Sequence, residues 1–285
     1  MVNARQAAYL QALGVDVYVP RSAPPLEPEP FAAARAAVPE ARQGVVEHDR
    51  APPATRPATP RATPTKVAPT APVEVQTPVP ARAPLEDIAR ELDWDSLRAA
   101  VAACQRCDLH GTRTQTVFGV GNPQARWMFI GEAPGADEDR QGEPFVGRAG
   151  QLLTSMIRAL GLRREDVFIA NVLKCRPPGN RDPKPSEAAS CRTYLERQVA
   201  LVNPTLVIAV GRIAAQNLLA TETPIAKLRG KVHAFGSRSW PLLVTYHPAY
   251  LLRTPSEKRK AWADLVQARQ LFERLQREGA EGAAT

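Results

Sequence analysis

The chain has 285 residues, a net charge of +8 and 28 prolines. It contains no run of about eighteen apolar residues, which excludes a membrane-spanning helix, and its first residues lack the charged-then-apolar pattern of a secretion signal. We therefore expect a cytoplasmic protein, and the basic charge makes nucleic acid a reasonable partner.

The first 84 residues differ in composition from the rest of the chain. Sixteen of the 28 prolines lie between Pro20 and Pro84, among Ala, Thr and Arg and with few large apolar residues. Such a segment buries too little apolar surface to offset its ordering entropy, so we expect residues 21–84 to form a disordered linker. Residues 1–20 have short helical and strand-like patterns, which favour either a docking peptide for a partner protein or a segment that folds back onto the main domain.

Residues 85–285 are predicted to form one α/β domain. The expected helices cover residues 85–103, 147–160, 186–202, 212–220 and 256–277. The expected strands cover residues 126–130, 167–173 and 205–210, with extended pieces at 231–235 and 242–246. Strands that alternate with helices predict a parallel sheet with helices on both faces, and hence three layers.

Polar side chains follow three of these strands. Glu132 comes after the first strand, Asn171 lies at the end of the second, and His247 follows the last. The first strand leads into a long Gly- and Pro-rich loop that also carries Phe145. Solvated loop acids and a structural histidine are the simpler interpretation. However, ligands of open α/β sheets bind at the carboxyl ends of the strands, so the convergence predicts a binding site.

The loop after Asn171 is basic and rich in proline. It contains four cationic side chains, Lys174, Arg176, Arg181 and Lys184. Contacts to nucleic-acid phosphates are the functional interpretation, and a solvated charged loop is the alternative.

The chain has four cysteines, Cys104, Cys107, Cys175 and Cys191. Structural disulfides are rare inside cells, and the C-x-x-C pair lacks a thioredoxin-like context. One site with four thiolate ligands is the better interpretation, and both zinc and a [4Fe–4S] cluster accept such a set. The second pair is spread over a loop and a helix, which favours iron–sulfur over a zinc ribbon. Ordinary burial of Cys175 and Cys191 is the alternative.

Several motifs in this sequence resemble the family 4 uracil-DNA glycosylases, the iron–sulfur branch of that superfamily. The resemblance covers about residues 85–271 and includes the four cysteines and the motifs Gly131-Glu-Ala-Pro-Gly135, Gly142-Glu-Pro-Phe-Val-Gly147, Asn171-Val-Leu-Lys-Cys-Arg-Pro-Pro178 and His247-Pro-Ala-Tyr250. It implies a four-stranded, mainly parallel sheet between helices and a [4Fe–4S] cluster on the four cysteines. It further implies a monomeric DNA-repair enzyme, associated with the nucleoid, that removes uracil and leaves an abasic site.

The resemblance also implies roles for individual residues. A uracil flipped out of the DNA would be held by residues of the three strand-end loops, namely Gly131, Ala133, Phe145, Asn171 and His247. Phe145 would stack on the base and Asn171 would hydrogen-bond its N3–H and O4. His247 would donate to the developing charge on O2, and Glu132 would position the attacking water.

Further expectations concern DNA contacts and one departure from a related family. Leu251 or Leu252 would wedge into the duplex, and Arg253 would contact the DNA. The first motif of family 1 carries an aspartate where this chain has Ala133, which makes the assignment of a base to Glu132 a hypothesis.

Two other functions compete with this interpretation. A zinc nucleobase deaminase is excluded because its H-x-E and P-C-x-x-C signature is absent from the sequence. A non-catalytic iron–sulfur protein, either a DNA-binding scaffold or an electron carrier, remains the alternative. Only an enzyme would create alkali-labile abasic sites in uracil-containing DNA.

Overall fold

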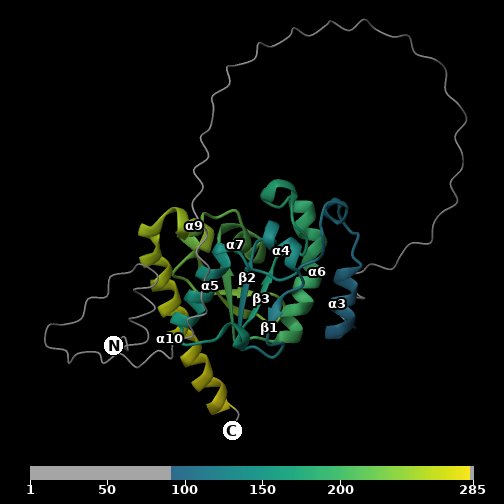
Figure 1. The fold of residues 1–285 in the computed structure, drawn as a ribbon. Coiled ribbons are helices and arrows are strands. Elements are labelled where there is room, and N and C mark those ends of the chain that lie inside the picture. Colours follow the sequence, from purple (N-terminus) through teal and green to yellow (C-terminus); the bar gives the residue numbers. More distant parts are fainter. Residues whose placement is uncertain (1–90, 283–285) are drawn as a thin grey trace, which may run out of the picture. The chain divides into compact units, whose positions relative to one another are not determined.

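The computed structural model of the protein describes residues 91–282 (Figure 1). The predicted docking peptide (1–20) and linker (21–84) lie outside these residues, as does the start of the helix expected at 85–103. Glu91 is helical, Leu92 and Asp93 are not, and helix α3 (Trp94–Ala102) follows, so the helix expected at 85–103 is interrupted before Trp94. Asp93 caps this helix, because its Oδ1 accepts a hydrogen bond of 2.8 Å from the backbone N–H of Ser96.

The sheet has six strands in the order β1-β3-β2-β4-β6-β5. Four apolar strands form its parallel centre: β2 (Trp127–Gly131), β3 (Phe168–Asn171), β4 (Leu206–Val210) and β6 (Trp240–Thr245). This centre confirms the predicted α/β fold with four mainly parallel strands. Two short antiparallel strands, β1 (Val120–Gly121) and β5 (His233–Phe235), extend the two edges.

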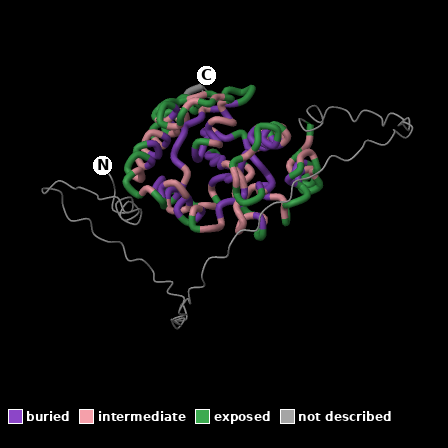
Figure 2. Tube along the Cα trace, turned by 90° about the horizontal axis from the view of Figure 1, so that it is seen from above, coloured by how far each residue is buried: buried purple, intermediate pink, exposed green. Residues whose placement is uncertain are grey.

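Helices cover both faces of the sheet, which confirms the three layers (Figure 1). One face carries α5 (Arg148–Ala159), α9 (Pro248–Arg253) and α10 (Lys258–Gly282). The other carries α3, α6 (Pro185–Val202), α7 (Arg212–Leu219) and α8 (Ile225–Leu228). Successive residues of a central strand pack into opposite cores, with Met128 in one core and Phe129 in the other. The buried segments of the tube therefore lie between the layers (Figure 2).

Three short helices, α4 (Ala136–Gln141), α8 and α9, form where only loops were expected. Helix α4 lies in the long loop after β2, and α9 follows His247 directly. Three acidic residues in the first turn stabilise α4, because their negative charges lie near the positive end of the helix dipole. Four 3-10 turns complete the described elements: Asp108–Gly111, Arg164–Asp166, Pro178–Asn180 and Pro255–Glu257. No helix within residues 91–282 is long and apolar enough to cross a membrane.

Candidate active site

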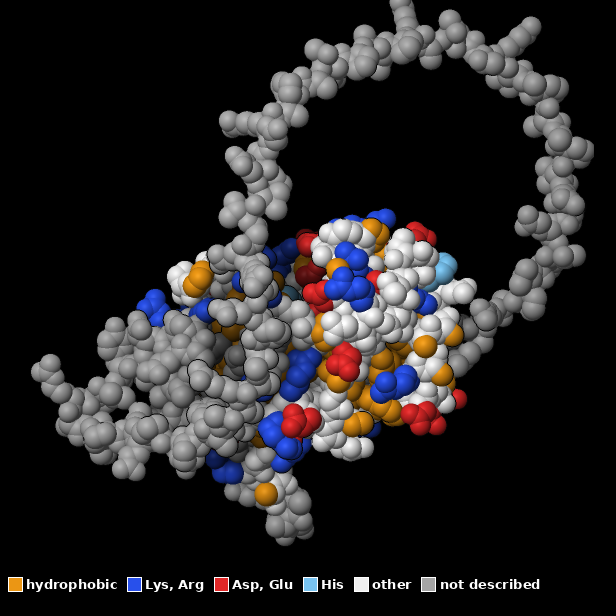
Figure 3. Space-filling model, viewed as in Figure 1, with side chains coloured by type: hydrophobic (Ala, Val, Ile, Leu, Met, Phe, Trp, Pro, Cys, Tyr) orange, Lys and Arg blue, Asp and Glu red, His pale blue; other side chains and the backbone are white. Residues whose placement is uncertain are grey.

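The carboxyl ends of β2, β3 and β6 open into one cleft of about 860 Å³. Glu132, Asn171 and His247 all line it, so the parallel sheet brings together the three strand-end residues that the sequence singled out. Phe145 and Ala133 line the same cleft. Lys, Arg, Asp and Glu side chains gather near α4 at this edge of the sheet (Figure 3).

Asn171 presents an unused hydrogen-bond acceptor in this cleft. Its side chain is 2% exposed, and its Oδ1 has no hydrogen-bond partner among the described residues. A buried amide oxygen without a partner costs free energy, so its presence in a cleft indicates a site that awaits a donor. Gly131 permits this arrangement, because a Cβ there would lie 2.5 Å from Oδ1 and 2.6 Å from the Phe145 ring.

Phe145 is held beside Asn171 by a strained loop with several supports. Its backbone has a φ of 55°, which is uncommon for a bulky residue. The N–H of Val146 donates to Glu138 Oε1 at 3.0 Å, and Arg164 donates to the carbonyl of Pro144 at 2.6 Å. A Cβ on Gly150 would lie 1.7 Å from the Phe145 carbonyl oxygen, so that glycine makes room for the loop.

His247 is neutral, and its tautomer is set by the start of α9. Burial, with a smaller contribution from Arg253, lowers the pKa of His247 to about 4. The backbone N–H of Ala249 donates to His247 Nδ1 at 3.1 Å. The single proton of the neutral ring is therefore on Nε2, which makes His247 a hydrogen-bond donor at neutral pH. Its ring centre lies 5.6 Å from that of Phe145.

Glu132 shares the cleft with an ion pair that the sequence did not reveal. Arg212, at the start of α7, donates to Asp182 Oδ2 at 2.8 Å, and both residues line the cleft. Burial, reinforced by the negative charge of Asp182 and opposed by Arg212, raises the pKa of Glu132 to about 7. A carboxyl group that titrates near neutrality is suited to acid–base chemistry.

Two of the side chains proposed to contact DNA, Lys174 and Leu251, are buried and so are not available for such contacts. Lys174 is 1% exposed and donates to the backbone carbonyl of Asn171 at 2.8 Å. Burial lowers the pKa of Lys174 to about 7, although the Cys191 and Cys175 sulfurs oppose this shift. Leu251 is also 1% exposed, because it packs into the core under α9, whereas Leu252 is 37% exposed.

The other predicted cationic contacts are accessible. Arg181 and Arg253 line the cleft, Lys184 is exposed and Arg176 is half-buried. Arg181 is held by a bidentate contact with the buried Glu187, at 2.9 Å and 2.6 Å. Nothing in the sequence pattern signalled this contact or the supports of the Phe145 loop, because each depends on which segments the fold brings together.

The four cysteines line one small cavity between α3 and α6. Cys104, Cys107, Cys175 and Cys191 are all free thiols, and Lys174 lies beside them. Arg113 donates to Cys175 Sγ at 3.1 Å. Within residues 91–282, no group of three His, Cys, Asp or Glu side chains meets the geometry for holding a single metal ion. Four cysteine sulfurs are the ligand set of a [4Fe–4S] cluster, and the cationic side chains beside them suit the negative charge that such a centre carries.

Comparison with known proteins assigns the family. The family model described as the uracil DNA glycosylase superfamily matches residues 118–266. The chain belongs to this superfamily. The type-4 uracil-DNA glycosylase of Archaeoglobus fulgidus is 47% identical over 186 residues, which cover 63% of this chain and 89% of the relative.

Two further type-4 relatives agree with this assignment. The type-4 uracil-DNA glycosylase of Saccharolobus solfataricus is 46% identical over 56% of this chain and 78% of its own length. That of Thermotoga maritima is 43% identical over 59% of this chain and 88% of its own length. These relatives confirm the resemblance to family 4 within the superfamily.

Proposed function

We propose that this protein removes uracil from DNA by hydrolysing its N-glycosidic bond, which leaves an abasic site for base excision repair. The observation that carries the proposal is the unpartnered Oδ1 of Asn171, buried next to the ring of Phe145 in the strand-end cleft. Names of the type-4 relatives support the same activity.

Asn171 explains how uracil would be selected. A base must leave the helical stack before its glycosidic bond can be reached. Uracil N3–H would then donate to Asn171 Oδ1, and the Asn171 amide group would donate to uracil O4. Cytosine has an acceptor at N3 and a donor at C4, so it would leave both groups of Asn171 mispaired and buried. Phe145 would stack on the extruded ring.

His247 and Glu132 would divide the chemistry between the two products. When the bond breaks, negative charge develops on uracil O2 and positive charge on the sugar. His247, as the neutral Nε2–H tautomer, would donate to O2 in the manner of an oxyanion hole. Glu132 would orient the water that attacks the sugar and would stabilise its positive charge. Ala133 offers no carboxylate, so Glu132 carries both tasks.

The duplex would be held by cations at the rim and by one leucine. Arg176, Arg181, Lys184 and Arg253 are the side chains we assign to phosphate contacts. Leu252 replaces Leu251 as the candidate wedge, because it alone of the two is exposed on α9.

A [4Fe–4S] cluster on Cys104, Cys107, Cys175 and Cys191 is part of the proposal. Its support is the meeting of four thiols at one cavity, with Arg113 donating to one sulfur. The cluster would brace the loop that carries Cys175 and would take no part in the reaction. Iron and sulfide analysis of purified protein tests this, and one bound zinc per chain would refute it.

Three earlier expectations stay predictions. They are a monomeric state, a cytoplasmic location near the nucleoid, and a protein partner for residues 1–20. Size-exclusion chromatography with light scattering addresses the first of them directly.

The activity is tested with a DNA strand that contains a single uracil, treated with alkali after incubation with the protein. Wild type should produce scission at the uracil, and Asn171→Ala and His247→Ala should each lose most of it. Glu165→Ala is the control, because this exposed side chain lies in the turn before β3, at the opposite end of that strand from Asn171. Absence of scission with folded, metal-loaded wild type would favour a DNA-binding scaffold or an electron carrier instead.

A further inference from the structure

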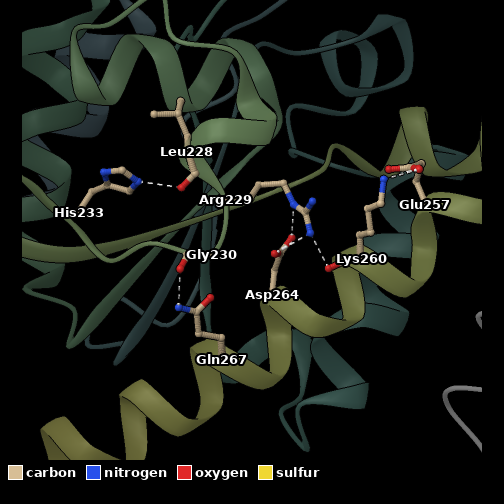
Figure 4. Close-up of polar contacts among 8 residues, drawn as sticks. All are labelled: Leu228, Arg229, Gly230, His233, Glu257, Lys260, Asp264 and Gln267. Atoms are coloured by element: carbon tan, nitrogen blue, oxygen red, sulfur yellow. Dashed lines mark hydrogen bonds and ion pairs between the residues drawn. The ribbon is translucent and has the colours of Figure 1, made fainter.

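A buried ion pair lies next to the candidate active site, and neither of its two residues lines the cleft. Arg229, which follows α8, makes a bidentate contact with Asp264 on α10, with N–O distances of 2.7 Å and 2.8 Å (Figure 4). The Arg229 and Asp264 side chains are only 12% and 7% exposed. Arg229 also donates to the carbonyl of Lys260 at 2.7 Å, so its guanidinium group is fixed by two points of α10.

Neighbouring contacts attach the same segment to the rest of the domain. Gln267 of α10 donates to the carbonyl of Gly230 at 3.1 Å, and the ring of His233 bonds the carbonyl of Leu228 at 2.8 Å (Figure 4). The position of Arg229 is therefore set by α10 and by the backbone on both sides of it.

The guanidinium group of Arg229 also lies over an aromatic ring next to the site. Its carbon is 4.2 Å from the centre of the Tyr246 ring, within the range of a cation–π contact. Tyr246 is buried and directly precedes His247, and its ring lies 5.1 Å from that of Tyr250 in α9. The two tyrosines thus bracket the segment that carries His247.

We propose that Arg229 is a positioning residue for His247, acting through Tyr246. This inference rests on the proposed function. The planar fork of arginine can hold the Asp264 carboxylate with its edge while its face packs on an aromatic ring, a combination that lysine lacks. Contacts with Arg229 and Tyr250 fix the position of Tyr246. The backbone of the adjacent His247 is then fixed relative to the cleft, so its Nε2–H points in one direction.

The test is a double-mutant cycle on single-turnover excision of uracil. Arg229→Met should lower the rate of the chemical step about 10- to 100-fold, the scale of a small misplacement of a reacting group, with little change in KM. The same substitution in a His247→Ala background should cause almost no further loss, because the residue through which it acts is gone. Arg229→Lys should fall between wild type and Arg229→Met.

Two variants guard against trivial outcomes. Arg229→Met leaves Asp264 buried without its partner, so Arg229→Met with Asp264→Leu removes both charges together and should show the same loss of rate. Arg269→Met is the matched control, because it breaks an exposed ion pair with Glu273 on the same helix, at 2.9 Å, and should leave the rate unchanged.

The leaving group gives a second readout. Fluorine at C5 makes the departing base a weaker base that needs less help from a donor at O2. The loss caused by Arg229→Met should therefore be smaller on 5-fluorouracil DNA than on uracil DNA. Equal losses on both substrates, or rate losses that multiply with that of His247→Ala, would overturn the inference. Inactive wild-type protein would instead refute the proposed function.

Discussion

Replacement of Gly131 by alanine is a sharp test of the uracil pocket. Gly131 ends β2 and lies against the two side chains assigned to the base. A Cβ at this position would lie 2.5 Å from Asn171 Oδ1 and 2.6–2.7 Å from two carbons of the Phe145 ring. Real Cβ contacts are essentially never shorter than 3.0 Å and are ordinarily 3.4–4 Å, so one or both groups must move by about half an ångström to one ångström.

The size of the effect follows from this displacement. A misplacement of about 1 Å in a group that reacts with the base or recognises it lowers the rate about 100-fold, which corresponds to roughly 2.7 kcal/mol of transition-state stabilisation. Overpacking also destabilises the fold by about 1–3 kcal/mol, which lowers the melting temperature by several degrees in a domain of this size. We expect Gly131→Ala to stay folded and to lose about two orders of magnitude in excision rate.

The assay is single-turnover cleavage of a uracil-containing strand, with circular dichroism at the assay temperature. Gly111→Ala is the control, because nothing lies within 4 Å of the Cβ it would add. Wild-type rates for a folded Gly131→Ala protein would refute the placement of uracil between Asn171 and Phe145.

Three further predictions concern the pH profile, the duplex and the cysteines. Because the pKa of Glu132 is raised to about 7, its carboxylate is lost as pH falls, so kcat/KM should rise with pH through about 7 and level off above it. Asp182→Asn removes a charge that raises this pKa and should move the rise to lower pH, whereas a flat profile from pH 5 to 8 would contradict the role of Glu132. Leu251→Ala should lower the free energy of unfolding by about 2–5 kcal/mol. Leu252→Ala should leave stability unchanged and slow excision from duplex DNA more than from single-stranded DNA. Equal effects on the two forms of DNA would exclude Leu252 as the wedge. Cys175→Ser should lower the iron content and the melting temperature together, and an unchanged iron content would remove this cysteine from the cluster.

The sequence determined the central sheet and the strand ends. Each parallel strand is a short apolar run buried on both faces, such as Trp127–Gly131, so the local composition is enough to predict it as a strand. Parallel strands place their carboxyl ends at one edge, and this rule alone predicted that Glu132, Asn171 and His247 would meet. The two-residue strand β1 carries no such pattern, because it is a strand only through its pairing with β3.

The tertiary structure decided the environment of each group. Leu251 and Leu252 are alike in sequence, and only the packing of α9 buries the first and exposes the second. Lys174 looked like a surface cation, but the fold buries its amine against the Asn171 carbonyl. The pKa of Glu132 depends on burial and on Asp182, fifty residues away along the chain. Local sequence specifies which groups are present, whereas their burial, partners and charge states depend on contacts between distant segments.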